Sequence, residues 1–214
     1  DLDLIETEIS EDNMLPIFIA ISKMNNVEEF VLKMSASGNC TGHSLSFVYE
    51  CVGKMEKLKS FSFTQLRFDM NKFTWLYISE NLTTLSNIRN LELYFDKCQK
   101  IDKFALRKLI EALKKLSQLR SLKLKLSVLD CLVPILVDFG IHLSTLENIK
   151  ELDIDIPETI TEKLANLSAR FKDILMKATH FERPPTVKMP TNLLQDERED
   201  KSIEIEEQLF ADDE

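Results

Sequence analysis

Histidine is the side chain that most often acts as the base in nucleophilic catalysis, and this sequence has three. The three histidines, His43, His142 and His180, stand far apart, and none belongs to a recognisable catalytic motif. Nucleophilic catalysis needs a nucleophile, a base and an orienting group held together in one place. We therefore predict no catalytic residue, and we expect a protein that is not an enzyme.

Metal binding is the second kind of chemistry that these residue types could support. Cys40 and His43 form a Cys-x-x-His pair, and Cys51 follows later in the chain. Structural zinc sites use closely spaced pairs of ligands, and a lone pair with one distant cysteine does not fit that spacing. We expect no metal site.

Phosphate and cofactor binding depend on glycine-rich loops. The four glycines are Gly38, Gly42, Gly53 and Gly140, and the close pair among them is not followed by Lys-Ser or Lys-Thr. A phosphate-binding loop needs that continuation. We expect no cofactor, no nucleotide hydrolysis and no small-molecule substrate.

A hydrophobic block recurs along the chain, and it predicts the strands and helices that carry the histidines, cysteines and glycines. The first residues of the blocks are spaced 31, 30, 31 and 30 positions apart, and five matches at one period indicate a repeat array. The blocks are Val27-x-x-Phe30-x-Leu32-x-Met34, Leu58-x-x-Phe61-x-Phe63, Ile88-x-x-Leu91-x-Leu93-x-Phe95, Leu119-x-x-Leu122-x-Leu124-x-Leu126 and Ile149-x-x-Leu152-x-Ile154-x-Ile156.

Each block predicts a strand that is followed by a helix. The blocks end in strict apolar/polar alternation, which is typical of a strand with one buried face, and the residues after them follow the i, i+3, i+4 spacing of an amphipathic helix. Trp75 is expected in the core of such a helix, from its pattern with Phe73 and Leu76, and an exposed anchor is the alternative. The predicted helical stripes include Val48, Cys51, Val52 and Met55, then Leu106, Leu109, Ile110 and Leu113, then Leu132, Ile135, Leu136 and Phe139.

A single unit of about 30 residues is too small to fold alone. Roughly seven buried side chains at about 2 kcal/mol each do not offset ordering costs of about 1.5 kcal/mol per residue. The units must therefore stack, with a continuous parallel sheet on one side and a layer of helices on the other. Leu2 and Leu4, followed by Phe18, Ile21 and Met24, predict a truncated sixth unit at the start.

The blocks and their period resemble the leucine-rich-repeat family, specifically its long-repeat, ribonuclease-inhibitor-like subclass. The resemblance covers residues 1–180 and implies an α/β leucine-rich-repeat solenoid. Its expected shape is a horseshoe arc of about six units of 30–31 residues, with a parallel concave sheet and convex helices. One feature departs from the family, because the Asn or Cys expected after each block is replaced here by Ser35, Leu66, Asp96, Ser127 and Pro157. The side-chain ladder that satisfies backbone groups in that turn is therefore not expected, and the units are expected to be irregular.

The repeat pattern ends near Phe181, which divides the chain into residues 1–180 and 181–214. Residues 158–179 predict a helix that completes and shields the last unit, and Arg183-Pro184-Pro185 and Pro190 then interrupt regular structure. Residues 191–214 hold ten acidic residues against Arg198 and Lys201, a net charge of -8 in a chain of -9. We expect a Pro-containing linker and an acidic, disordered tail. Its apolar residues leave open that it folds on a partner: Leu193, Leu194, Ile203, Ile205, Leu209 and Phe210.

Residues 97–125 form a basic stretch. Asp102 and Glu111 are the acidic residues within it, against ten cations, an excess of eight positive charges. The stretch is either the solvated face of a convex helix with two strand positions, or a dock for an acidic partner or for the chain's own tail. We do not expect a nucleic-acid partner, because the chain as a whole is acidic and has no interleaved aromatic platform. The cations are Lys97, Lys100, Lys103, Arg107, Lys108, Lys114, Lys115, Arg120, Lys123 and Lys125.

Strand alternation predicts which side chains point away from the core. We expect a partner to bind Tyr94, Lys123 and Lys125, together with Glu92, Asp153 and Asp155, because tyrosine is enriched at interfaces and the charges supply complementarity. Plain solvent exposure is the alternative for each of these residues. The three predicted rows are Glu29, Ser60, Asn90, Ser121 and Glu151; Val31, Ser62, Glu92, Lys123 and Asp153; and Lys33, Thr64, Tyr94, Lys125 and Asp155.

The length of the apolar runs and the spacing of the cysteines indicate the cellular compartment of the protein. The longest apolar stretches fall well short of the roughly 20 residues that cross a bilayer, so no membrane partner is expected. Cys40, Cys51, Cys98 and Cys131 lack framework spacing, which favours reduced thiols in an intracellular, cytoplasmic or nuclear protein. Three glycosylation sequons, at Asn39, Asn81 and Asn166, keep a secreted protein as the alternative.

Repeat architecture without catalytic residues favours a binding function. We expect a non-catalytic scaffold or assembly subunit that binds a protein partner through the repeat surface, within a larger complex. Two alternatives remain open. The repeats also resemble the substrate-recognition region of an F-box-type ubiquitin-ligase adaptor, and the chain could instead regulate a GTPase or another enzyme.

Overall fold

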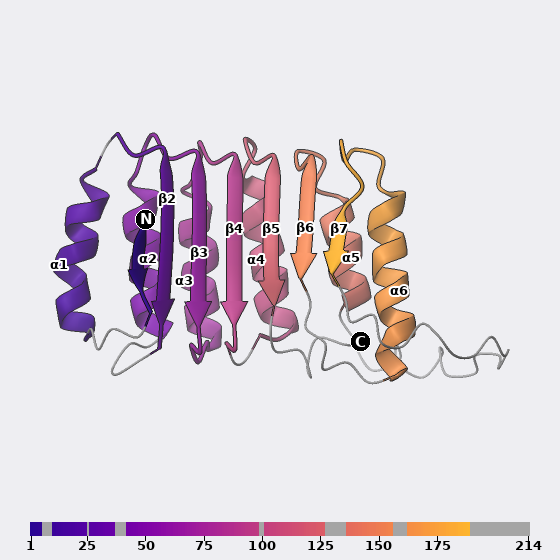
Figure 1. Ribbon diagram of the computed structural model, residues 1–214, viewed down its shortest axis with the longest axis horizontal. Coiled ribbons are helices and arrows are strands. Elements are labelled where there is room, and N and C mark those ends of the chain that lie inside the picture. Colours follow the sequence, from indigo (N-terminus) through magenta and orange to yellow (C-terminus); the bar gives the residue numbers. More distant parts are fainter. Residues whose placement is uncertain are drawn as a thin grey trace, which may run out of the picture.

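Strands and helices alternate along the chain, and the seven strands form one parallel sheet in chain order (Figure 1). The computed structural model describes residues 1–5, 10–24, 26–36, 42–98, 101–126, 136–155 and 162–188. The predicted α/β class is thereby confirmed. The strands are β1 Leu2–Leu4, β2 Glu29–Ser35, β3 Ser60–Leu66, β4 Asn90–Asp96, β5 Ser121–Leu126, β6 Glu151–Asp155 and β7 Thr186–Lys188. The helices are α1 Glu11–Ser22, α2 Gly42–Gly53, α3 Lys72–Leu82, α4 Lys103–Lys115, α5 Leu136–Ser144 and α6 Glu162–Lys177.

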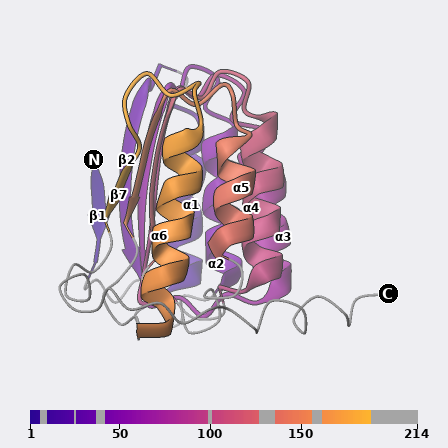
Figure 2. The same ribbon diagram turned by 90° about the vertical axis from the view of Figure 1, so that its right-hand side faces the viewer.

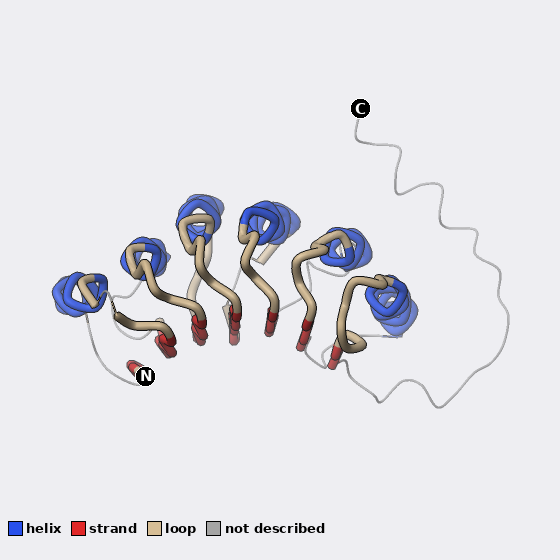
Figure 3. The backbone as a smooth tube through the Cα atoms, turned by 90° about the horizontal axis from the view of Figure 1, so that it is seen from above, coloured by secondary structure: helices blue, strands red, loops and turns tan. Residues whose placement is uncertain are grey.

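The molecule has two layers. Figure 2 shows the strands in one layer and all the labelled helices on one side of it. Seen from above, the strands follow the inner side of a shallow arc and the helices follow its outer side (Figure 3). A parallel sheet needs a crossover after every strand, and here every crossover returns on the same side, so the other side of the sheet is left without a helix in the described part of the chain.

The register of the sheet is the one that the repeat predicts. Ser62 pairs with Glu92, Glu92 with Lys123, and Lys123 with Asp153. The rows that begin at Glu29 and Lys33 are matched in the same way across β2 to β6, so all three predicted rows are confirmed. We call the face of the sheet that bears these three rows the open face.

The core lies between the sheet and the helices. Alternate strand residues point into it, as in β4, where Leu91, Leu93 and Phe95 are fully buried. Trp75 is also buried, as expected, and packs 5.2 Å from the ring of Phe95 between centroids. Its neighbour Phe73 is not part of the core, because 72% of it is exposed.

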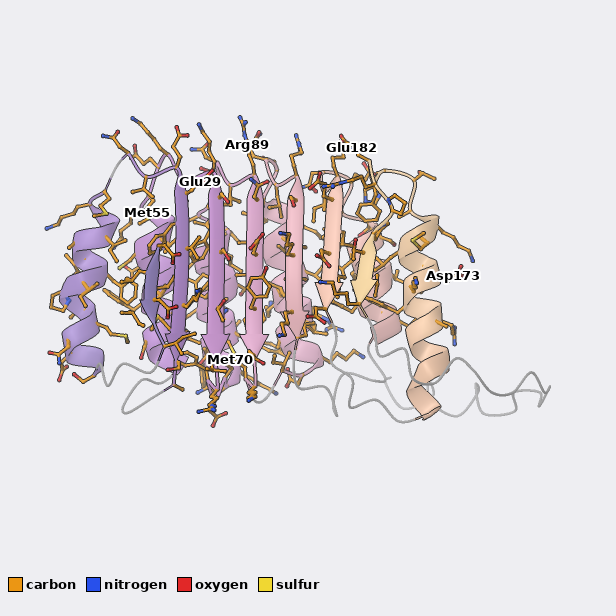
Figure 4. The ribbon with its side chains drawn as sticks, in the orientation of Figure 1. Glu29, Met55, Met70, Arg89, Asp173 and Glu182 are labelled. Atoms are coloured by element: carbon orange, nitrogen blue, oxygen red, sulfur yellow. The ribbon has the colours of Figure 1, made fainter. Side chains whose placement is uncertain are left out.

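Backbone hydrogen bonds join each unit to the next at the edge where the strands begin. The carbonyl of Glu28 accepts from the amides of Lys59 and Ser60, at 2.7 and 3.0 Å. The carbonyls of Lys59, Arg89 and Arg120 each accept two amides of the following unit in the same way. Figure 4 shows Glu29 and Arg89 along this edge and Met70 at the opposite one. The ladder fixes the spacing of the units, since each unit satisfies donors of its successor.

Backbone groups and a thiol satisfy the turns that follow β3 and β4. The amide of Arg67 donates to the carbonyl of Asp96 at 2.8 Å, and the Cys98 thiol donates to the carbonyl of Gln65 at 3.2 Å. Arg67 and Lys97 occupy equivalent places and have φ angles of 62° and 54°, in a region that side chains other than glycine seldom adopt. The two turns therefore share one left-handed backbone conformation, and the expected irregularity of the units stays a prediction.

The sheet continues past the domain boundary that we expected near Phe181. The amide of Glu182 donates to the carbonyl of Lys150 at 3.0 Å, and β7 then pairs with β6. Pro184 and Pro185 precede β7 instead of ending the array, because their missing amides fall outside the paired residues. The division into a repeat body and a tail stays a prediction, and residues 189–214 lie outside the described part.

Candidate functional site

All six residues that the sequence proposes for partner binding lie together on the open face. They come from three adjacent strands, β4, β5 and β6, whose register places them in two neighbouring rows. Adjacent strands are about 4.8 Å apart, so each side chain can reach its neighbour across the row. We call this group the central face: Glu92, Lys123 and Asp153 in one row and Tyr94, Lys125 and Asp155 in the next.

Glu92 is the most connected member of the central face. Lys123 Nζ lies 2.7 Å from Glu92 Oε1. The hydroxyls of Tyr94 and Ser62 both donate to Oε2, each at 3.1 Å. Three strands therefore converge on one carboxylate. Ser62 was not among the residues we proposed for binding, although it stands in the same predicted row.

The surroundings of Glu92 fix the charge states of this network. Burial alone would raise the pKa of Glu92, but the hydrogen bonds from Lys123, Tyr94 and Ser62 outweigh it and leave the pKa lowered. Burial, together with the Glu92 carboxylate, raises the pKa of Tyr94 to about 12. The hydrogen bond to Glu92 raises the pKa of Lys123. At neutral pH the network thus holds a carboxylate, an ammonium and a protonated phenol.

Two groups of the central face have no ion-pair or hydrogen-bond partner among the described residues. Lys125 makes no ion pair with any residue in the described ranges, although it lies between Tyr94 and Asp155 in the register. Asp153 Oδ1 is buried and has no hydrogen-bond partner among the described atoms. A buried carboxylate oxygen without a donor is costly, and in this conformation the oxygen is not accessible to another molecule.

A hollow of about 710 Å³ lies over this part of the open face. Glu92, Lys123 and Asp153 line it, and Pro184 and Thr186 of the last unit close one side. Arg183 and Glu151 also line the hollow, and they form an ion pair with each other. Pockets for small ligands are mostly apolar, whereas charged and hydroxyl side chains dominate this lining.

The cysteines and histidines of the described part do not gather into a reactive site. Cys51 and Cys98 are buried and unpaired, and burial raises their pKa values to about 11 and about 12. Thiols in that state are protonated at neutral pH and are poor nucleophiles. Within the described ranges, no three side chains of the metal-binding types converge. Cys40 and Cys131 lie outside those ranges.

The basic stretch divides among several surfaces. The exposed side chains of Lys103, Arg107, Lys114 and Lys115 lie on α4, in the helix layer. Arg120 Nη1 donates to backbone carbonyls, among them that of Asn148 at 3.1 Å. Lys123 and Lys125 are on the open face, and Lys100 falls outside the described residues. The stretch therefore does not form a single cationic surface.

Comparisons with known proteins give no family. No protein-family model matches the chain, and no curated protein matches its sequence. No helix in the described residues combines the length and the apolar composition needed to cross a bilayer.

Proposed function

We propose that this chain is a non-catalytic scaffold or assembly subunit that binds a protein partner through the central face. In this proposal the chain is a leucine-rich-repeat solenoid of the long-repeat type, and the open face is its concave, ligand-binding side. The 30–31-residue period, the parallel sheet in chain order and the helices on one side support that reading.

The observation that carries the proposal is the network around Glu92. Its members are held by neighbouring strands and by one another, so little side-chain freedom remains to be lost when a partner binds. Tyr94 supplies the aromatic surface that interfaces favour. Lys125 supplies a cation that has no ion pair among the described residues. Charges arranged in this way give a partner its register and specificity.

The dimensions of the open face fit a protein partner. Seven strands about 4.8 Å apart span roughly 29 Å, and the five strands β2 to β6, of five to seven residues, each span roughly 20 Å. A standard interface buries about 800 Å² on each partner. The open face offers a comparable area, because its protruding side chains add surface to the flat area of the sheet.

Affinity capture with the full chain tests the proposal. The wild type is compared with a triple variant of the central face, Tyr94→Ala, Lys123→Glu and Lys125→Glu, and bound proteins are identified by mass spectrometry. We expect the wild type to capture a stoichiometric partner that the variant loses. The identity of the partner also tests the alternatives, because a ubiquitin-ligase subunit or a GTPase would favour an adaptor or a regulator.

A matched control has the same change in charge on α6. Its substitutions are Lys172→Glu, Met176→Ala and Lys177→Glu, at positions exposed on the opposite side of the molecule. The control should capture the partner as the wild type does. Equal capture by a correctly folded central-face variant would contradict the proposed site.

A further inference from the structure

The outward side of α3 exposes two aromatic side chains. Phe73 is 72% exposed, and Tyr77, one turn later on the same side of the helix, is 49% exposed. The neighbouring helix α4 places Phe104 in the equivalent first turn, where it is only partly buried. Grouped, exposed aromatic surface marks an interaction site more often than isolated apolar residues do.

Two lysines lie beside one of these rings, that of Phe104, and one of them, Lys108, is also paired with Glu111 at 2.6 Å. Lys72 Nζ lies 5.8 Å from the centroid of the Phe104 ring, and Lys108 Nζ lies 5.9 Å from it. Lys103 and Arg107 are exposed and have no ion pair with a residue in the described ranges. Together, α3 and α4 carry six cationic side chains against Glu80 and Glu111, a net charge of +4.

The aromatic side chains and the cations occupy adjoining parts of the helix layer. Lys103 and Arg107 line a hollow with Asp138 of α5, on the side of α4 that faces away from α3. The contact of Lys72, from α3, with Phe104, from α4, connects the two helices. Figures 2 and 3 agree that α3 and α4 lie at the crest of the helix layer, far from the open face. We call these adjoining parts together the convex patch: Phe73, Tyr77 and Phe104 with Lys72, Lys103, Arg107 and Lys108.

We propose that residues 191–214 of this same chain cover the convex patch. That segment has a net charge of -8, opposite in sign to α3 and α4. It also has apolar side chains beside its carboxylates, in Ile203-Glu204-Ile205 and Leu209-Phe210. Acidic groups can pair with Lys103 and Arg107 while the apolar groups cover Phe73 and Tyr77, so the charges and the apolar side chains are both complementary.

The length of the segment permits this contact. Packed helices lie about 10 Å apart, so α3 is roughly 30 Å from α6, and about 10 Å more separates the sheet from the helices. Fifteen residues of extended chain after Lys188 reach about 50 Å. Ile203 to Phe210 can therefore lie on α3 without any change in the repeat body.

Photo-cross-linking of the full chain identifies what covers the patch. A photoreactive p-benzoylphenylalanine replaces Tyr77, and the irradiated protein is separated by mass before its cross-linked peptides are sequenced. We expect a cross-link within a single chain, joining position 77 to a peptide from residues 191–214. Cross-links to a second copy, cross-links to other segments, or no cross-link would each overturn the proposal.

Tryptic cleavage after Arg198 and Lys201 gives a second, independent readout in the full chain. The double variant Phe73→Ser and Tyr77→Ser should be cut there about tenfold faster than the wild type, since it loses the apolar part of the contact. About 0.5 M NaCl should also speed cleavage of the wild type, because salt screens the charged part.

Met176→Ser is the control for the cleavage experiment. Met176 is 48% exposed on α6, so its loss removes exposed apolar surface away from the convex patch. The tail of the Met176→Ser variant should be cut at the wild-type rate. If the double variant keeps the wild-type unfolding midpoint and its tail is also cut at the wild-type rate, the proposal is overturned.

Discussion

Lys123 Nζ on β5 lies 2.7 Å from Glu92 Oε1 on β4, across the boundary between two repeat units. Both side chains are partly exposed, at 45% and 28%, so solvent screens the pair and its contribution to stability is small. Its effect is geometric. The pair holds the carboxylate where the hydroxyls of Tyr94 and Ser62 also reach it, which orders the centre of the open face.

Replacing Glu92 tests this coupling. Glu92→Gln keeps the shape of the side chain and removes its charge, so the pKa of Tyr94 should fall below about 12 while burial keeps it above the ordinary value of 10.0. Tyrosine resonances followed by NMR through a pH titration measure the shift. Glu80→Gln, on the exposed side of α3, is the control and should leave the pKa of Tyr94 unchanged. A Tyr94 pKa that Glu92→Gln does not lower would contradict the network.

Acid should weaken the same network. The pKa of Glu92 in the folded protein lies below the ordinary 4.5, so the unfolded chain binds its proton more readily. The stabilisation is therefore fully present above about pH 4.5 and is lost as the pH falls through the folded pKa. The difference in the free energy of unfolding between wild type and Glu92→Gln, measured in urea, should shrink from about pH 7 to about pH 3. A constant difference would mean that the carboxylate is not held as described.

A buried polar pair in the core gives a prediction about stability. Gln65 Nε2 donates to the Tyr49 hydroxyl at 3.1 Å, and both side chains are fully buried. Equivalent positions in neighbouring strands hold Met34 and Phe95. Tyr49→Phe or Gln65→Met alone should cost about 1–3 kcal/mol, because each leaves a buried polar group unpaired.

The double variant is the control for that pair. Tyr49→Phe combined with Gln65→Met removes both polar partners and should be close to the wild type in stability, or above it. Denaturant unfolding of the four proteins measures the cycle. Simple addition of the two single losses would show that the pair is not coupled.

Gly140 allows α5 and α6 to approach closely. A Cβ there would lie 2.7 Å from Phe171 Cδ2, and the Phe171 ring stacks on Phe139 with centroids 6.3 Å apart. Gly140→Ala should therefore cost about 1–3 kcal/mol of unfolding free energy by overpacking.

Gly53→Ala is the matched substitution for Gly140→Ala. Its new Cβ would lie 2.1 Å from the hydroxyl oxygen of Thr84, an exposed side chain that can rotate away if it gives up its hydrogen bond to the carbonyl of Asn81. Thermal unfolding of both variants should therefore show a clear loss of stability for Gly140→Ala and a much smaller change for Gly53→Ala. Equal losses would show that the contact with Phe171 does not determine the effect.

The register of the open face could be predicted from sequence, and its contacts could not. Alternation within a strand and the 30–31-residue period together determine that Ser62, Glu92, Lys123 and Asp153 share a row. Which of them touch depends on side-chain rotamers, which a hydrophobic pattern does not encode. Ser62 was missed for that reason.

The last strand and the convex aromatics were harder to predict for different reasons. The prolines before Thr186 indicated the end of regular structure, yet proline is compatible with the residues just outside a strand, and β7 forms directly after them. Phe73 fits a helical apolar stripe with Leu76, but the neighbouring units leave it outside the core. The exposure of a helical residue depends on its neighbours in space, which the sequence of one unit does not specify.

The most direct measurement is the affinity of the full chain for its purified captured partner, determined by isothermal titration calorimetry. The triple variant Tyr94→Ala, Lys123→Glu and Lys125→Glu should bind roughly 100-fold more weakly than the wild type, because it removes an aromatic anchor and reverses two charges. The α6 control should bind like the wild type. A folded triple variant with wild-type affinity would show that the partner binds elsewhere and would contradict the assignment of the central face.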